Sequence, residues 1–262
     1  MELIIIYLGL GVFAGLVAGL FGVGGGLIIV PALTLLFQAY GIASTSYVHL
    51  AIGTSLATIV VTSISSMRAH DRHGAVLWDV FRQLAPGIVI GALIGALIAD
   101  MLPTAALRIV FGVFELAVAI QIGFNLMASP HRHLPRPRVM GAVGTVVGVI
   151  SSVIGIGGGT MTVPFLVWCN VSIRKAVATS SACGLPISIA GAAGFVFTGW
   201  NEPTLPPGST GYLYWPAFAG IAAASVVFAP LGARLAHTLP VAILQRVFAV
   251  FLAVLGLRML IG

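Results

Sequence analysis

The longest stretch of this chain without a charged side chain runs from residue 3 to residue 67, which is 65 positions between Glu2 and Arg68. One helix needs about 20 consecutive apolar residues to cross the hydrocarbon core of a bilayer, so this stretch has room for roughly three crossings. Over the whole chain, 59% of the 262 residues are hydrophobic and 7% are charged. A soluble domain carries far more charge on its surface. We therefore expect an all-α polytopic membrane protein and exclude a soluble enzyme.

Charge-free apolar segments predict the individual helices. Two of them, 27–37 and 160–170, are only 11 residues long. At about 1.5 Å per residue, such a helix covers roughly half of the bilayer core. Each of these half-length segments follows a cluster of glycines. The full set of predicted helices is 3–20, 27–37, 48–67, 84–99, 108–128, 139–154, 160–170, 176–198, 213–233 and 240–261.

The glycine clusters belong to an internal duplication. The segment Gly22–Pro31 (GVGGGLIIVP) repeats the glycines and the proline of Gly155–Pro164 (GIGGGTMTVP) in register. Further along each half, AIGTSLA at 51–57 has a counterpart in AVATSSA at 176–182. Such a repeat in an apolar chain is typical of transporter folds. We predict a first membrane repeat at 1–128, a basic cytoplasmic linker at 129–138 and a second membrane repeat at 139–262.

Two topologies are compatible with these segments. If each glycine-interrupted pair makes one crossing, the chain has eight spans, with seven basic residues inside and five outside. If each pair is a hairpin that returns to the same face, six full spans remain and the split is ten to two, with only Arg108 and Arg258 outside. The positive-inside rule favours the second arrangement. It places both termini in the periplasm of a bacterial inner (plasma) membrane and makes the two halves inverted repeats.

The glycine clusters lack the features of a nucleotide-binding loop. Leu27 and Thr160 stand where the third glycine of G-x-G-x-x-G is required, and no P-loop lysine follows. In a membrane, glycine instead allows the backbone to leave the helix, and the next short helix directs its free N–H groups at an anion. The alternative is close helix packing, which we expect for Gly11, Gly15, Gly91 and Gly95. The candidate substrate-binding glycines are Gly24, Gly25, Gly26, Gly157, Gly158 and Gly159.

The doubled pattern G-x-G-G-G-x-x-x-x-P, with one copy opening each half, resembles the TauE/SafE sulfite exporter family. This family is also called the toluene-sulfonate uptake permease family. The resemblance covers essentially the whole chain. It implies an inner-membrane transporter of small sulfur-containing anions, such as sulfite, sulfoacetate or another organosulfonate. The family includes exporters and importers, so neither the direction nor the exact substrate follows from it.

Several polar residues fall inside apolar segments. Thr54 and Ser55 match Thr179 and Ser180 in the repeat, and hydroxyl groups can donate to sulfonate oxygens without the cost of burying a cation. The alternative is a hydrogen bond to their own or a neighbouring helix. His49, at the start of a span, is a further substrate-binding candidate, with an interfacial role as the alternative.

Glu115 is the one carboxylate inside an apolar segment, and ionisable groups at membrane depth are functional candidates. It is our candidate for proton coupling. Arg108 lies seven residues earlier on the same helical face, so a structural ion pair is the competing interpretation.

No catalytic motif or metal-ligand spacing is present. We therefore expect neither an enzyme nor a cofactor or a metal site, and no nucleic-acid partner. The expected partners are a small sulfur anion and the lipid bilayer, and the oligomeric state is open. The favoured function is secondary active transport by alternating access. The alternative is an uncoupled anion channel or a membrane scaffold.

Overall fold

The computed structural model describes residues 2–21, 24–43, 45–124, 126, 133–235 and 241–261. Within these residues the chain forms helices and one short hairpin: α1 Glu2–Phe21, α2 Gly26–Ala39, α3 Tyr47–Asp71, α4 Trp78–Met101, α5 Thr104–Gly123, α6 Pro137–Ile154, α7 Gly159–Trp168, α8 Ile173–Thr198, β1 Ser209–Thr210, β2 Leu213–Tyr214, α9 Trp215–Leu235 and α10 Val241–Ile261. Seven described helices are long and apolar enough to cross a membrane: α1, α3, α4, α5, α6, α8 and α9. The prediction of an all-α polytopic membrane protein is confirmed.

The two half-length helices occur where the sequence predicts them. The first, α2, has 14 residues and the second, α7, has 10. Each has a proline one and a half turns after its start, Pro31 and Pro164. The last turn of α7 is followed by Asn170 with φ of 63°, a left-handed conformation that asparagine tolerates better than most residues.

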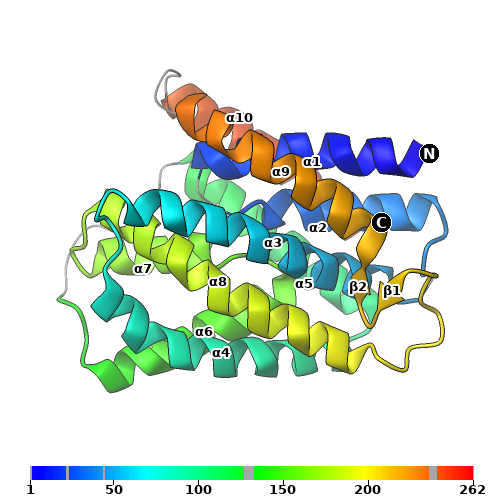
Figure 1. Ribbon diagram of the computed structural model, residues 1–262, viewed down its shortest axis with the longest axis horizontal. Coiled ribbons are helices and arrows are strands. Elements are labelled where there is room, and N and C mark those ends of the chain that lie inside the picture. Colours follow the sequence, from blue (N-terminus) through cyan, green and yellow to red (C-terminus); the bar gives the residue numbers. More distant parts are fainter. Residues whose placement is uncertain are drawn as a thin grey trace.

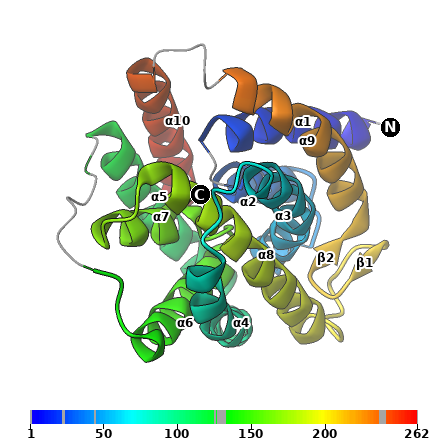
Figure 2. The ribbon, with the colours of Figure 1, turned by 60° about the vertical axis from the view of Figure 1, so that its left-hand side comes forward.

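The helices pack mainly in pairs drawn from opposite halves of the chain. The closest pairs are α1 with α9, α4 with α6, α3 with α8 and α5 with α10. In Figures 1 and 2, α1 and α9 lie on one side of the molecule, α4 and α6 lie on the opposite side, and α3 and α8 run between them. The two halves are therefore intertwined rather than separate bundles.

The direction of each pair follows from its contacts. Within the central pair, the Gly53 region of α3 touches Phe195 of α8, and Ser66 donates a hydrogen bond of 3.2 Å to Ser181. Residue numbers rise along α3 as they fall along α8, so these helices are antiparallel. The helices α5 and α10 are also antiparallel, because Gly112 faces Leu260 and Gly123 faces Ala249. Both chain ends lie at the same end of the molecule in Figure 1.

Small residues bring several of these helices together. A β-carbon on Gly11 would lie 2.6 Å from the carbonyl oxygen of Ile221, and one on Gly15 would lie 2.7 Å from Cα of Ser225. Gly91 and Gly95 face the backbone of α6 in the same way. These glycines serve close packing, which is how membrane helices associate without a hydrophobic driving force.

Element boundaries differ from the sequence prediction at charged ends. Helix α4 begins at Trp78 rather than at 84, because the charge-free criterion stops at Arg82. Asp79 and Arg82 form an ion pair of 3.7 Å in its first turn, with side chains 91% and 75% exposed. The helix thus extends beyond the apolar stretch. The β1–β2 hairpin before α9 was not predicted, and its two-residue strands are too short to leave a hydrophobic pattern.

Candidate functional site

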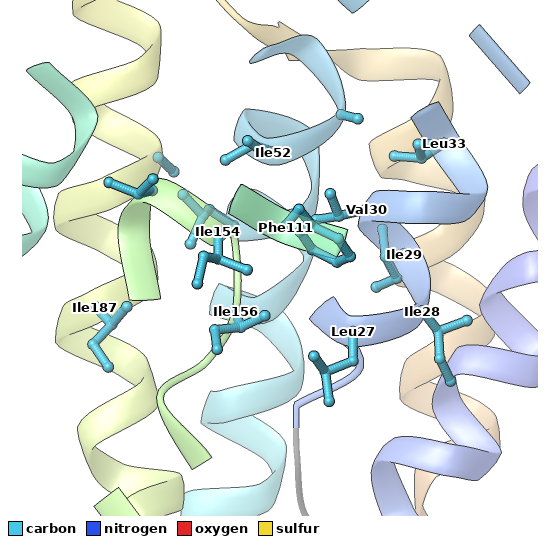
Figure 3. Packing of buried hydrophobic residues seen from close by; sticks show 14 of the residues in the cluster. Leu27, Ile28, Ile29, Val30, Leu33, Ile52, Phe111, Ile154, Ile156 and Ile187 are labelled. Carbon is cyan, nitrogen blue, oxygen red and sulfur yellow. The ribbon is translucent and has the colours of Figure 1, made fainter. Parts of the chain in front are cut away.

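The two glycine motifs meet backbone to backbone inside the molecule. A β-carbon on Gly26 would lie 2.6 Å from the carbonyl oxygen of Gly155 and 2.9 Å from Cα of Ile156. One on Gly24 would lie 3.7 Å from Cα of Gly157. A side chain is excluded by the distances at Gly26, whereas the distance at Gly24 is an ordinary van der Waals contact and its φ of 77° is what favours glycine there. Figure 3 shows Ile156 between Ile187 of α8 and Leu27 of α2 at this crossing.

Both short helices begin with a left-handed glycine. Gly25 caps α2 with φ of 80°, and Gly158 caps α7 with φ of 74°. The carbonyl oxygen of each cap accepts the N–H groups of the residues three and four positions later, at 2.8–3.1 Å. The earlier N–H groups have no partner within a helix and carry its positive dipole end. The two positive ends start close to the motif crossing.

The matching serines behave differently in the two halves. Ser55 on α3 donates a 3.0 Å hydrogen bond to the carbonyl oxygen of Gly155, which ties α3 to the second glycine motif. Ser180 on α8 is 1% exposed, and its hydroxyl has no hydrogen-bond partner among the described residues. Gly22, the repeat counterpart of Gly155, lies outside the described residues.

The matching threonines make equivalent structural contacts. Thr54 accepts a hydrogen bond of 3.0 Å from the backbone N–H of Tyr214, just before α9. Thr179 accepts one of the same length from the backbone N–H of Leu77, just before α4. Each threonine thus caps the start of a helix in the other half of the chain. Each oxygen thus accepts a structural hydrogen bond, while the O–H of the same hydroxyl can still be donated.

His49 lies away from the motif crossing. Its Nε2 is 3.0 Å from the carbonyl oxygen of Ala99, and its ring stacks on that of Tyr212 with centroids 5.1 Å apart. The hydroxyl of Tyr212 donates to Asp100 over 3.3 Å. His49 precedes Ser55 by six residues, or roughly 9 Å along a helix. The structure therefore places His49 in a cluster at the helix ends rather than beside the glycines.

Glu115 is fully buried on α5, and both carboxylate oxygens lack a hydrogen-bond partner among the described residues. Arg108 is engaged elsewhere: its guanidinium donates to the carbonyl oxygen of Met259 and, over 3.4 Å, to the hydroxyl of Tyr47. The interpretation of Arg108 and Glu115 as a structural ion pair is therefore wrong. The Arg108 side chain reaches Tyr47 at the start of α3, and Glu115 lies two turns further along α5.

Two hydroxyl groups near Gly158 were not predicted as site residues. The hydroxyls of Ser151 and Thr162 lie 3.5 and 3.6 Å from the position of a β-carbon on Gly158. Both residues are buried, and neither hydroxyl has a partner among the described residues. Serine and threonine are common in membrane helices, so the sequence by itself does not distinguish these two from the others. A residue-by-residue comparison of the two repeats would have placed them among several hydroxyl residues of the second half that replace Ala, Ile, Gly or Leu of the first.

The described part of the chain contains no group of three His, Cys, Asp or Glu side chains that could hold a metal ion. Cys169 and Cys183 are both buried.

Apolar helices that cross a membrane, with two half-length helices whose ends meet inside the bundle, define the class of polytopic membrane transporters. The sequence profile of the family described as Sulfite exporter TauE/SafE matches residues 7–259. The chain belongs to the TauE/SafE sulfite exporter family and is a multi-pass bacterial membrane transporter.

Curated relatives agree with this assignment. A probable membrane transporter protein of Haemophilus influenzae is 36% identical over 98% of this chain and 97% of its own length. Another, from Methanocaldococcus jannaschii, is 28% identical over 96% of this chain and 93% of its own. The probable membrane transporter protein YunE of Bacillus subtilis is 30% identical over 65% of this chain and 70% of its own length. No solved structure matches the chain.

Proposed function

We propose that this protein is a secondary active transporter of small sulfur-containing anions, such as sulfite, sulfoacetate or another organosulfonate, working by alternating access. The observation that carries the proposal is the backbone contact of the two glycine motifs, Gly26 against Gly155, beside the left-handed caps Gly25 and Gly158 that begin α2 and α7. Helix N-termini inside a membrane protein favour anions. The family description adds the sulfur chemistry.

Selectivity for charge would come from the backbone rather than from cationic side chains. Among the described residues, the atoms nearest to a β-carbon on Gly24, Gly25, Gly26 or Gly158 include none from Lys or Arg. Partial charges on N–H groups, together with hydroxyl donors, can hold an anionic group without the desolvation cost of a buried cation. Such a site also releases its ligand more readily than a buried ion pair would.

Alternating access is supported by the relation between the two halves. An inverted repeat with six spans and two hairpins makes the corresponding helices α3 and α8 antiparallel, as they are in the structure. Eight spans would make them parallel. The equivalent hydrogen bonds of Thr54 and Thr179 to the opposite halves fit the same two-fold relation. Inverted repeats allow one half to rock against the other around a central site.

We also propose that Glu115 carries the coupled proton. An unpaired carboxylate is costly at membrane depth, so the side chain would be neutral in the state described here. Glu115 lies on α5, which contacts α3, and Ser55 of α3 binds the second glycine motif. Proton binding would thus occur on a helix that contacts the helix tied to this motif.

A binding titration with a panel of ligands tests the proposed substrate class. We expect purified protein to bind at least one of sulfite, sulfoacetate and taurine more tightly than acetate, and to bind a neutral analogue, such as the methyl ester of a sulfonate, at least about tenfold more weakly. The reason is that N–H dipoles stabilise the anion's charge and lose that contribution with a neutral ligand. Equal affinity for the neutral analogue would contradict an anion site at the glycine caps. Saturable, competitive uptake by proteoliposomes would separate a transporter from a channel or a scaffold.

Cysteine accessibility tests the proposed orientation. We expect a cysteine introduced at Glu202 to react with a membrane-impermeant maleimide from outside the cell. One introduced at His133, within the basic linker, should react only after permeabilisation, because basic loops stay in the cytoplasm. The native thiols give little background, since Cys169 is 4% exposed and Cys183 is 0% exposed. Labelling of position 133 from outside would contradict the predicted topology, in which the linker is cytoplasmic.

A further inference from the structure

The ends of α2 and α7 share one backbone geometry. Gly25 has φ of 80° and ψ of −15°, and Gly158 has φ of 74° and ψ of −6°. The two glycines are 133 positions apart, which is the offset between the two glycine motifs. The same places around each cap can therefore be compared between the halves.

The side chains at these places differ in chemistry. Around Gly25, the β-carbon position meets Cβ of Ala18 at 3.7 Å and Cδ1 of Ile29 at 3.5 Å. Around Gly158, the residues at the same offset of 133 are Ser151 and Thr162, whose hydroxyl oxygens lie at 3.5 and 3.6 Å. A methyl group and an isoleucine tip in the first half thus correspond to two hydroxyls in the second.

The two hydroxyls are free to bind a ligand. Ser151 is 0% exposed and Thr162 is 1% exposed, and neither hydroxyl has a hydrogen-bond partner among the described residues. A buried hydroxyl without a partner costs free energy, which bonding to a ligand would recover. Their position at the N-terminal end of α7 adds two O–H donors to the free N–H groups of that helix. Among the described residues, the three atoms nearest to a β-carbon on Gly25 include no such donor, and one of them is the carbonyl oxygen of Ala14 at 3.6 Å.

We infer that the two helix ends are not equivalent, and that Ser151, Thr162 and the N-terminus of α7 form the subsite that holds the oxygen atoms of the sulfur oxyanion. This inference rests on the proposed function. Sulfite and sulfonate groups have several acceptor oxygens, so they can accept from both hydroxyls and from backbone N–H groups together. The end of α2 contributes its dipole and its close contact with the second motif.

An apolar side chain covers this subsite in the present conformation. Cδ1 of Ile187 on α8 occupies the space next to Gly158, where a β-carbon would be. Entry of an oxyanion therefore requires the Ile187 side chain to change rotamer or α8 to move away from α7.

Isosteric substitutions test the inference. The ligands are sulfite and sulfoacetate, titrated into purified protein in detergent, and each variant is also melted thermally. We expect Ser151→Ala and Thr162→Val each to weaken binding about tenfold or more, because each removes a hydrogen bond to a charged group. The melting temperature should stay the same or rise, because an unpartnered buried hydroxyl is removed.

Thr34→Val is the matched control. Thr34 on α2 is also buried (1% exposed), and its hydroxyl is also unpartnered among the described residues, but it is not near Gly158. We expect this variant to bind as the wild-type protein does. Wild-type affinity in the Ser151→Ala, Thr162→Val double variant would overturn the subsite but leave the proposed function intact. Failure of the wild-type protein to bind any anion of the panel would overturn both.

Discussion

Leucine in place of Gly158 is expected to abolish uptake of the sulfur anion while the protein still folds and inserts. Gly158 caps α7 in the left-handed region, where an L-residue costs about 1–2 kcal/mol. A bundle of this size should tolerate that cost. The leucine side chain would compete with Ile187 for the space over the first turn of α7 and shield the N–H groups that attract the anion. Uptake by proteoliposomes and thermal melting in detergent, measured side by side, provide the test.

Gly25→Leu should also abolish uptake. Its φ of 80° imposes the same backbone cost, but the nearest atoms lie at 3.5–3.7 Å, so a β-carbon itself fits. The lost function would then come from the side chain beyond the β-carbon, which blocks the end of α2. Because the two ends approach one site from opposite halves, neither should substitute for the other.

Two other glycines on α1 provide the controls. Gly9 has no atom within 4 Å of its β-carbon position, so Gly9→Leu should leave uptake and melting unchanged. Gly15→Leu should lower both, because its β-carbon would lie 2.7 Å from Cα of Ser225 and push α1 away from α9. If Gly158→Leu and Gly25→Leu behave like Gly15→Leu, the motifs serve packing alone. Wild-type uptake in both would refute the site.

Replacement of Glu115 by glutamine is expected to eliminate the stimulation of uptake by a pH gradient. Glutamine keeps the size and polarity of the side chain but cannot bind or release a proton at this depth. Exchange of labelled for unlabelled anion across the membrane should persist, because exchange needs no net proton movement. The measurement is uptake by proteoliposomes with and without an imposed gradient, beside anion exchange at equal pH.

Glu2→Gln is the matched control for this substitution. Glu2 is exposed at the start of α1, so the same change there should leave the response to the gradient intact. Equal stimulation in the Glu115→Gln variant and in the wild-type protein would contradict coupling through Glu115. So would wild-type uptake that does not respond to the gradient at all.

The apolar segments and the doubled glycine motif could be predicted from the sequence because each depends on residues that are close together in the chain. Lipid surrounds each helix with the same hydrocarbon, so hydropathy and length predict a span whatever its neighbours are. The starts of α2 and α7 were predicted within about one residue, because left-handed glycines and short apolar segments mark them. Helix starts were predicted less accurately where the helix continues through charged residues beyond the apolar segment, as at Asp79 and Arg82 in α4.

Only the tertiary structure decided which polar groups have partners. Thr54 and Thr179 looked like ligand donors, yet their oxygens accept N–H groups that precede α9 and α4. Arg108 and Glu115 lie on one helical face, but Arg108 reaches Tyr47 on α3 and Met259 on α10 instead. In each case the partner is distant in sequence, so no local pattern reveals it.

Sequence therefore determined the number, place and approximate length of most helices, and the positions of the two motifs that interrupt them. The tertiary structure decided that these motifs touch backbone to backbone, since Gly26 and Gly155 come together from opposite halves of the chain. It also decided that Ser151 and Thr162 remain without a partner among the described residues, while Ser55 is bonded to Gly155. The physical reason is that burial in lipid depends on composition along one helix, whereas satisfaction of a polar group depends on which helices become its neighbours.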